Sequence, residues 1–154
     1  MTELAITEFD RADFGGKDED ALVALWDRAG LTRPWNDPRL DIRFACAAPA
    51  STILVGRLAE EDTIAACVMV GHDGHRGTVY YVATDPDWRG HGFGREMMAA
   101  AEDWLAAKGI WKLNLLIRGD NATAKGFYEA LGFHAQERIC MQKEIKAAAT
   151  PKAG

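Results

Sequence analysis

The stretch from residue 78 to residue 117 constrains the fold more than any other part of the chain. The apolar, β-branched run 78–84 predicts a strand, helical periodicity up to Lys108 predicts a helix, and the apolar run 111–117 predicts a second strand. Two strands joined through a helix call for a parallel crossover connection. We therefore expect a sheet that contains a parallel pair.

The residues before this unit have a different pattern. Strands are expected at 4–10, 51–58 and 63–71, and helices at 18–29 and at about 38–47. Neighbouring strands joined by short polar turns favour an antiparallel meander. After the parallel unit we expect a helix at 122–131 and one or two strands within 133–146. The class is thus α/β, with a mixed, mostly antiparallel sheet and about four flanking helices.

Length and composition favour one compact domain. The chain has 154 residues, of which 48% are hydrophobic, and we expect a single domain over 1–146 with a frayed tail at 147–154. A net charge of −5 argues against a nucleic-acid partner, because such binding needs a basic face. No apolar run approaches the roughly 18 residues that cross a membrane.

The expected location is the cytoplasm. The acidic start MTEL does not resemble a secretory signal, which opens with basic residues. Cys46, Cys67 and Cys140 are widely spaced, so we interpret them as reduced thiols that act as small core hydrophobes.

Three alternating glycines, Gly90, Gly92 and Gly94, connect the strand at 78–84 to the following helix. Glycine lets backbone amides approach a ligand, and the first N–H groups of a helix attract anions, above all phosphate. Three basic side chains add positive potential here: Arg89, His91 and Arg95. The spacing matches neither a Walker loop nor a dinucleotide-binding fingerprint. A purely structural glycine turn stays open as the alternative.

Two segments together resemble one known family. Residues 89–94, R-G-H-G-F-G, resemble the R/Q-x-x-G-x-G/A signature of the GNAT N-acetyltransferase superfamily. Residues 121–133, N-A-T-A-K-G-F-Y-E-A-L-G-F, resemble its N-x-x-A-x-x-x-Y-E-x-x-G-F block. The resemblance covers roughly residues 4–143. Within the family, the stretches 33–38 and 73–77 are most similar to small bacterial acetyltransferases of the YpeA type.

The resemblance implies the GNAT fold, in which acetyl-CoA lies between two splayed parallel central strands, here 78–84 and 111–117. The backbone of the first strand would pair with the pantetheine arm, and amides of the glycine loop would bind the pyrophosphate. The cofactor-binding residues would be Val82, Ala83, Thr84, Arg89, Gly90, His91, Gly92, Phe93, Gly94, Arg95 and Asn121.

The resemblance also implies a catalytic role for Tyr128. Its phenol would protonate the departing CoA thiolate, since a phenol stays protonated at neutral pH. An amine would attack the thioester directly, and a backbone N–H near residues 81–82, freed by a bulge or splay, would stabilise the oxyanion. The alternative for Tyr128 is a core aromatic residue.

One position departs from part of the family. Some members that acetylate protein N-termini carry a glutamate twelve residues before the tyrosine, where this chain has Leu116. In its place we consider Asp73, His72 and His75, at the turn before the strand 78–84, as substitutes for this base. The alternative is a plain Asp-Gly hairpin turn. Ligands crowded into one turn seldom converge on a metal, so we expect none.

The segment 33–38 lies where GNAT proteins place a wall of the acceptor site. Trp35 could stack on a substrate, and Asn36 and Asp37 could bind a cationic amine. The alternative is a rigid connector with a tryptophan that caps the core.

We therefore expect an acetyl-CoA-dependent N-acetyltransferase whose acceptor is a small-molecule or peptide amine. The other class that stays open is an acyl-CoA-binding sensor or partner module with little or no turnover, and O-acyl transfer would use the same groove. We expect no nucleic-acid or membrane partner, and a homodimer is one candidate assembly.

Overall fold

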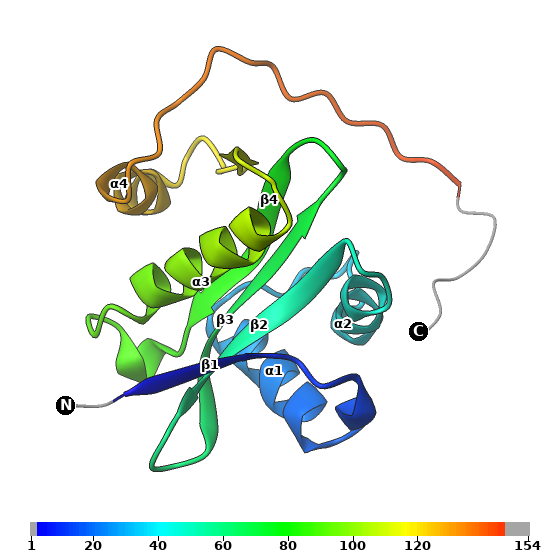
Figure 1. Ribbon diagram of the computed structural model, residues 1–154, viewed down its shortest axis with the longest axis vertical. Coiled ribbons are helices and arrows are strands. Elements are labelled where there is room, and N and C mark those ends of the chain that lie inside the picture. Colours follow the sequence, from blue (N-terminus) through cyan, green and yellow to red (C-terminus); the bar gives the residue numbers. More distant parts are fainter. Residues whose placement is uncertain (1–2, 147–154) are drawn as a thin grey trace. The chain divides into compact units, whose positions relative to one another are not determined.

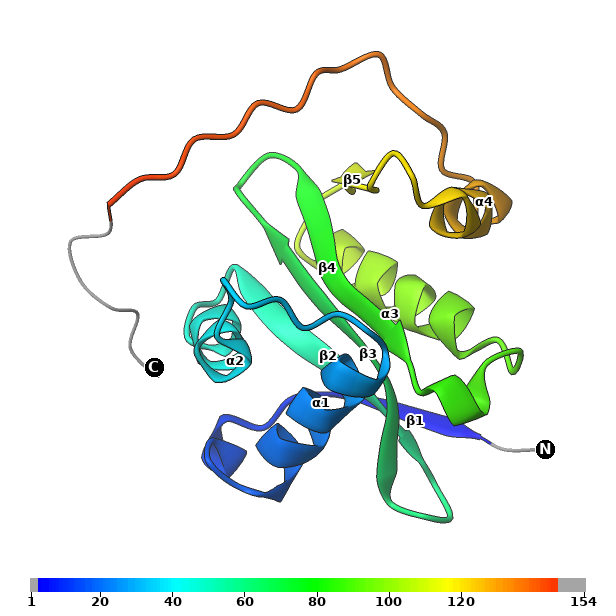
Figure 2. The ribbon, with the colours of Figure 1, turned by 180° about the vertical axis from the view of Figure 1, so that it is seen from behind.

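The computed structural model describes residues 3–146. These residues form two compact units, and the boundary between them in the sequence lies between Leu115 and Leu116. The first unit contains a sheet and three α-helices, and the second contains one helix (Figures 1 and 2).

Five strands form one sheet in the order β1-β2-β3-β4-β5. Their bounds are Leu4–Glu8 (β1), Ser51–Leu58 (β2), Thr63–His72 (β3), Gly77–Thr84 (β4) and Leu113–Asn114 (β5). The first four pair antiparallel through short connections, whereas β5 pairs parallel to β4 after a helical crossover. The predicted α/β class, with a mixed and mostly antiparallel sheet and four α-helices, is confirmed. The parallel pair lies at the end of the strand order.

Helices cover both faces of the sheet. Helices α1 (Lys17–Arg28) and α2 (Pro38–Cys46) lie on one face, and α3 (Phe93–Ala107) lies on the other (Figures 1 and 2). Apolar side chains at helical spacing explain this docking, because they form one buried stripe along each helix. On α1 these are Leu22, Leu25 and Trp26, and on α3 they are Phe93, Met97, Met98, Ala101 and Leu105.

The start of α2 is encoded locally. The Asp37 carboxylate accepts hydrogen bonds from the backbone N–H groups of Arg39 and Leu40, and Pro38 occupies the first helical position. Both features are typical of helix N-termini, since they satisfy or remove donors that lack an intrahelical partner. This cap fixes the residue at which α2 begins.

A buried carboxylate joins α1 to α2. Glu19 is fully buried, and its two oxygens accept hydrogen bonds from Arg39 Nη1 at 2.7 Å and Arg43 Nε at 3.0 Å. Burial alone would raise the pKa of Glu19, but the hydrogen bonds from Arg43 and Arg39 outweigh it and hold this pKa below its ordinary value. The ion pairs therefore favour the charged form and fix α2 against α1.

Two strand predictions are corrected by the structure. Only Leu113 and Asn114 of the expected strand 111–117 pair with β4, opposite Gly77 and Thr78. The segment 133–146 contains no strand, although one or two were expected. Alternating apolar residues are only a local signal, and a strand also needs a neighbour whose backbone groups pair with it in register.

The second unit contains helix α4 (Ala122–Ala130). The Asn121 side chain caps this helix by accepting a hydrogen bond from Ala124 N at 3.0 Å. The segment after α4 carries Cys140, which is exposed, whereas Cys46 and Cys67 are buried. The interpretation of the cysteines as core hydrophobes thus holds for two of the three. No helix among residues 3–146 combines the length and apolarity needed to span a bilayer.

The ion pairs of Glu19 with Arg39 and Arg43, here called the Glu19 clamp, predict that the stability of the fold depends on pH. Glu19→Gln should lower the free energy of unfolding by about 1.5–3 kcal/mol at pH 7, because it weakens two charge-assisted hydrogen bonds. A lowered pKa stabilises the fold above the ordinary carboxyl value of about 4.3, and this stabilisation is lost as the pH falls through the folded-state value. The difference between variant and wild type should therefore shrink between pH 7 and pH 3, measured by urea unfolding.

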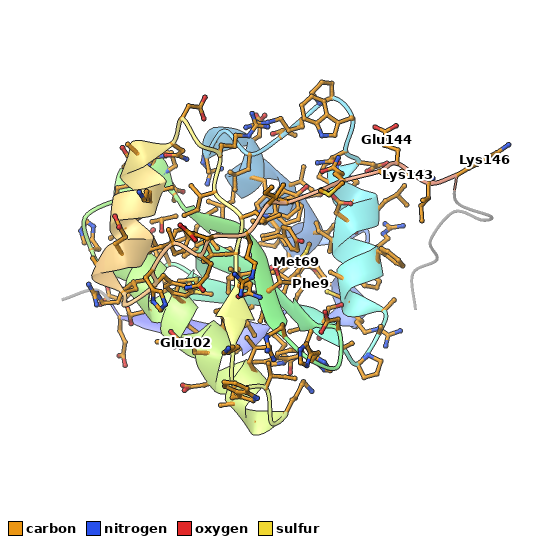
Figure 3. The ribbon with its side chains drawn as sticks, turned by 90° about the horizontal axis from the view of Figure 1, so that it is seen from above. Phe9, Met69, Glu102, Lys143, Glu144 and Lys146 are labelled. Carbon is orange, nitrogen blue, oxygen red and sulfur yellow. The ribbon has the colours of Figure 1, made fainter. Side chains whose placement is uncertain are left out.

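Glu102→Gln is the matched control for this experiment. Glu102 is an exposed residue of α3 (labelled in Figure 3), so its substitution should change stability by less than about 0.5 kcal/mol. Equal stability of Glu19→Gln and the wild type at pH 7 would contradict the clamp.

Candidate functional site

One edge of β4 lacks a strand partner over most of its length. Pairing with β5 ends at Thr78 and Asn114, so the edge from Val79 to Thr84 pairs with no strand among residues 3–115. The opposite edge is paired, since Ala83 and Thr84 lie opposite Cys67 and Ala66 of β3. Within residues 3–115, the backbone N–H and C=O groups along this edge of β4 therefore have no strand partner and are available to a ligand.

A bulge interrupts β4 within this edge. Tyr81 and Val82 together oppose the single residue Val68, because the β3–β4 register shifts between Cys67 and Met69. Tyr81 has φ +51°, a left-handed conformation that is unfavourable for a tyrosine. Its carbonyl accepts a hydrogen bond from Cys67 Sγ at 3.2 Å. The bulge turns backbone groups at residues 81–82 away from the regular ladder, as the sequence analysis expected.

The glycine loop follows β4 and leads into α3. Gly92 is the N-cap of α3 with φ +80°, and no side chain caps the helix there. Gly90 also has a positive φ of +84°, and both glycines border open space. The first N–H groups of α3 are thus free to bind an anion, with the partial positive charge of the helix end behind them.

The side chains of this loop divide into exposed and buried ones. Arg89, His91 and Arg95 are exposed, whereas Phe93 is buried in the core and can offer only its backbone to a ligand. The imidazole Nδ1 of His91 lies 3.0 Å from the carbonyl oxygen of Trp88. The loop therefore carries the guanidinium groups of Arg89 and Arg95 close to the uncapped N-terminus of α3.

A cavity of about 480 Å³ opens between α2 and strands β3 and β4. Met69, labelled in Figure 3, lies between the sheet and α2 and forms part of its wall. The lining residues are Leu31, Asn36, Asp41, Phe44, Ala45, Ser51, Met69, Val70, Gly71, Thr78, Tyr80 and Tyr81. Since Tyr81 belongs both to this wall and to the bulge of β4, the cavity adjoins the unpaired strand edge.

The predicted acceptor residues take different positions. Asn36 lines the cavity, but Trp35, which is 72% exposed, does not. The carboxylate of Asp37 caps α2. Asp41, which was not predicted from the sequence, also lines the cavity, and its Oδ2 accepts a hydrogen bond from the Tyr81 hydroxyl at 2.7 Å. No sequence signal links residues 40 positions apart on a helix and a strand.

Tyr81 is held firmly on its other sides. Its ring stacks on the buried Trp26, with centroids 3.8 Å apart and an interplanar angle of 10°. Burial and the hydrogen bond to Asp41 raise the pKa of Tyr81, while the nearby Asn36 and Arg33 act in the opposite direction. The phenol is therefore protonated at neutral pH, and its O–H donates a hydrogen bond to the Asp41 carboxylate.

Asp73 occupies the turn between β3 and β4. Its Oδ1 accepts hydrogen bonds from the backbone N–H groups of Arg76 and His75, both at 2.8 Å. These bonds lower the pKa of Asp73, and the residue does not line the cavity. The geometry is that of a hairpin turn in which the carboxylate supports the loop. Among residues 3–146, no three His, Cys, Asp or Glu side chains gather as a metal site would require.

The remaining predicted residues belong to the second unit. Asn121 uses its side-chain oxygen to cap α4, which leaves its amide N–H groups as donors. Tyr128 makes edge contacts with Phe127 and Phe133, and burial raises its pKa. Its phenol is therefore protonated at neutral pH. Leu116, at the position of the family's glutamate, is exposed.

Comparison with known proteins shows the family of this chain. Residues 20–133 match the acetyltransferase (GNAT) family. An acetyltransferase of Yersinia pestis (strain Pestoides F) is 38% identical over 132 residues, which cover 86% of this chain and 92% of the relative. The chain belongs to the GNAT acetyltransferase family.

Two solved structures have the same fold. AAC(6′)-Iy in complex with the bisubstrate analog CoA-S-monomethyl-acetylneamine superposes with a TM-score of 0.75 at 14% identity, covering 94% of this chain and 99% of that chain. An aminoglycoside acetyltransferase from an uncultured soil metagenomic sample, in complex with sisomicin, gives a TM-score of 0.72 at 15% identity, covering 94% and 97%. At such identities the likeness concerns the fold.

Proposed function

We propose that this protein transfers the acetyl group of acetyl-CoA directly to the amine of a small molecule. The observation that carries the proposal is the position of Tyr81, which joins the unpaired edge of β4 to the wall of the cavity. A donor bound along the strand edge and an acceptor bound in the cavity would meet at this residue. Such proximity supplies much of the catalysis in a reaction between two bound substrates.

The glycine loop is suited to the pyrophosphate of the donor. Gly90 and Gly92 border open space, and a side chain at either position would occupy the volume next to the free amides. Arg89 and Arg95 are exposed beside them and can neutralise phosphate charge. The neighbour AAC(6′)-Iy was solved with a CoA-containing ligand, which supports this assignment.

The strand edge is suited to the pantetheine arm and the thioester. Backbone groups of Val82, Ala83 and Thr84 would pair with the amides of the arm, as a further strand would. Acetyl-CoA supplies an activated acetyl group, and an N–H at the bulge, near residues 81–82, would stabilise the negative charge that develops on the carbonyl oxygen.

Tyr128 and Asn121, the two further residues that the family resemblance implies, would supply the proton and a further donor. Tyr128 would protonate the thiolate that leaves as the amine nitrogen forms its bond to the acetyl carbon. A phenol with a raised pKa is protonated at neutral pH and can serve as this acid. Asn121 would donate a hydrogen bond from its free amide N–H groups. Because Asp73 supports a turn and has a lowered pKa, the acceptor would lose its proton to water or to a group of the cavity.

Gly92→Glu should abolish acetyl-CoA binding. The new carboxylate would lie at the amides that bind the pyrophosphate and repel it, so we expect the Kd to rise at least about 100-fold in calorimetric titration. Gly109→Glu is the matched control, because Gly109 has φ +81° and borders open space beyond the other end of α3. Unchanged affinity in Gly92→Glu would refute the placement of the donor.

Tyr128→Phe should lower kcat by roughly ten- to a thousand-fold if the phenol acts as the acid. The Kd for acetyl-CoA should stay within about twofold of the wild-type value, because the substitution keeps the ring. Thiol release measures the turnover, and calorimetry measures the binding. A variant with wild-type kcat would show that the acid is another group.

A panel of amines tests the function as a whole. Thiol release from acetyl-CoA is measured with 2-phenylethylamine, sisomicin and a peptide with an N-terminal alanine. Turnover of the first would support the proposal, and exclusive turnover of the peptide would replace a small-molecule acceptor with a peptide. Donor binding without thiol release on any amine would favour a sensor instead.

A further inference from the structure

The cavity beside β4 is mostly apolar and carries a single carboxylate. Leucine, phenylalanine, alanine, methionine and valine side chains form much of its wall, and Asp41 is the one acidic residue among the twelve that line it. A volume of about 480 Å³ is in the range of small-molecule sites. The lining therefore suits an apolar body with one group that complements a negative charge.

The Asp41 carboxylate lacks a cationic partner among residues 3–146. Its neighbours on the same helix, Arg39 and Arg43, pair with the buried Glu19. Arg33 uses its guanidinium to donate to the carbonyl oxygens of Gly30 and Thr32. The hydrogen bond from Tyr81 thus leaves most of the acceptor capacity of Asp41 unused.

The fold holds this carboxylate in a fixed position. Tyr81 belongs to the bulge of β4, and its ring stacks on Trp26. Its hydroxyl donates a hydrogen bond of 2.7 Å to Oδ2 of Asp41, which holds the carboxylate in place. Asp41 lies in the first turn of α2, which Asp37 caps and the Glu19 clamp ties to α1. A partly buried, preorganised carboxylate gains more from an incoming cation than a solvated one would.

We propose that Asp41, positioned by Tyr81, binds the ammonium group of the acceptor, and that the acceptor is a monoamine with an apolar body. This inference rests on the proposed acetyl transfer, because it names the substrate class of the same site. The ammonium lies against Asp41, and the apolar body packs against side chains such as Leu31, Phe44 and Met69.

The same lining discriminates against polycations. A ligand with several ammonium groups would transfer them from water into a largely apolar wall with one carboxylate to compensate for the loss of hydration. Sisomicin, the ligand of one structural neighbour, is such a polycation. We therefore expect this cavity to bind sisomicin more weakly than a monoamine with an apolar body.

Calorimetric titration of the CoA-bound protein with 2-phenylethylamine tests the inference. Asp41→Asn should weaken amine binding about 10- to 100-fold, because the amide keeps the bond to Tyr81 but loses the charge. Asp103→Asn, the same change at an exposed residue of α3, should leave the Kd within about twofold. The neutral isostere 2-phenylethanol should bind the wild type at least about tenfold more weakly than the amine does, a comparison that requires no variant.

Four results would overturn the inference: no amine binding to the wild type, equal binding of the amine and the alcohol, an unchanged Kd in Asp41→Asn, or tighter binding of sisomicin than of 2-phenylethylamine. Thiol release measured in parallel separates this failure from that of the proposed function. Amine binding that depends on Asp41 without thiol release would refute acetyl transfer and leave the recognition site standing. If 2-phenylethylamine is acetylated and its KM is the same in Asp41→Asn as in the wild type, the recognition site alone would be refuted.

Discussion

The bulge at Tyr81 is the constraint on which the candidate site depends. A regular β4 would direct its backbone groups only to strand neighbours, whereas two residues opposite Val68 reorient the backbone at positions 81 and 82. The left-handed backbone conformation of Tyr81 is energetically unfavourable, and three contacts hold it in place. Trp26 stacks on the ring, the Cys67 thiol donates a hydrogen bond to the carbonyl oxygen, and the Asp41 carboxylate accepts a hydrogen bond from the hydroxyl. Strain at this residue is thus stabilised by packing from α1, β3 and α2.

Local charge matters more in this protein than net charge. The chain carries −5 overall, yet its glycine loop combines an uncapped helix terminus with two exposed arginines. The cavity has the opposite character, since its one carboxylate lies in a mostly apolar wall. The proposed phosphate-rich donor and cationic acceptor would therefore bind next to each other, each attracted by local charges that salt screens beyond about 10 Å.

Much of the fold follows from local patterns. The bounds of β2 agree with the prediction, those of α1 and α2 differ from it by at most one residue at each end, and α3 ends one residue before the predicted Lys108. Periodicity, caps and glycines act within a few positions, so local sequence is enough to define these elements. The strand expected at 111–117 reduces to two residues, and none forms within 133–146. In both segments a strand needs a partner strand to pair with, and apolar alternation alone does not provide one.

The sequence by itself determined the family and the position of the glycine loop, because a phosphate site of this kind is made by consecutive backbone amides. It also named Asn36 as an acceptor residue, on the segment before α2. It could not reveal Asp41 as the carboxylate of the cavity, since its partner Tyr81 lies on a strand 40 positions away. Only the tertiary structure decided that pairing, because helix α2 and the bulge of β4 become neighbours when the sheet and its helices pack into one core.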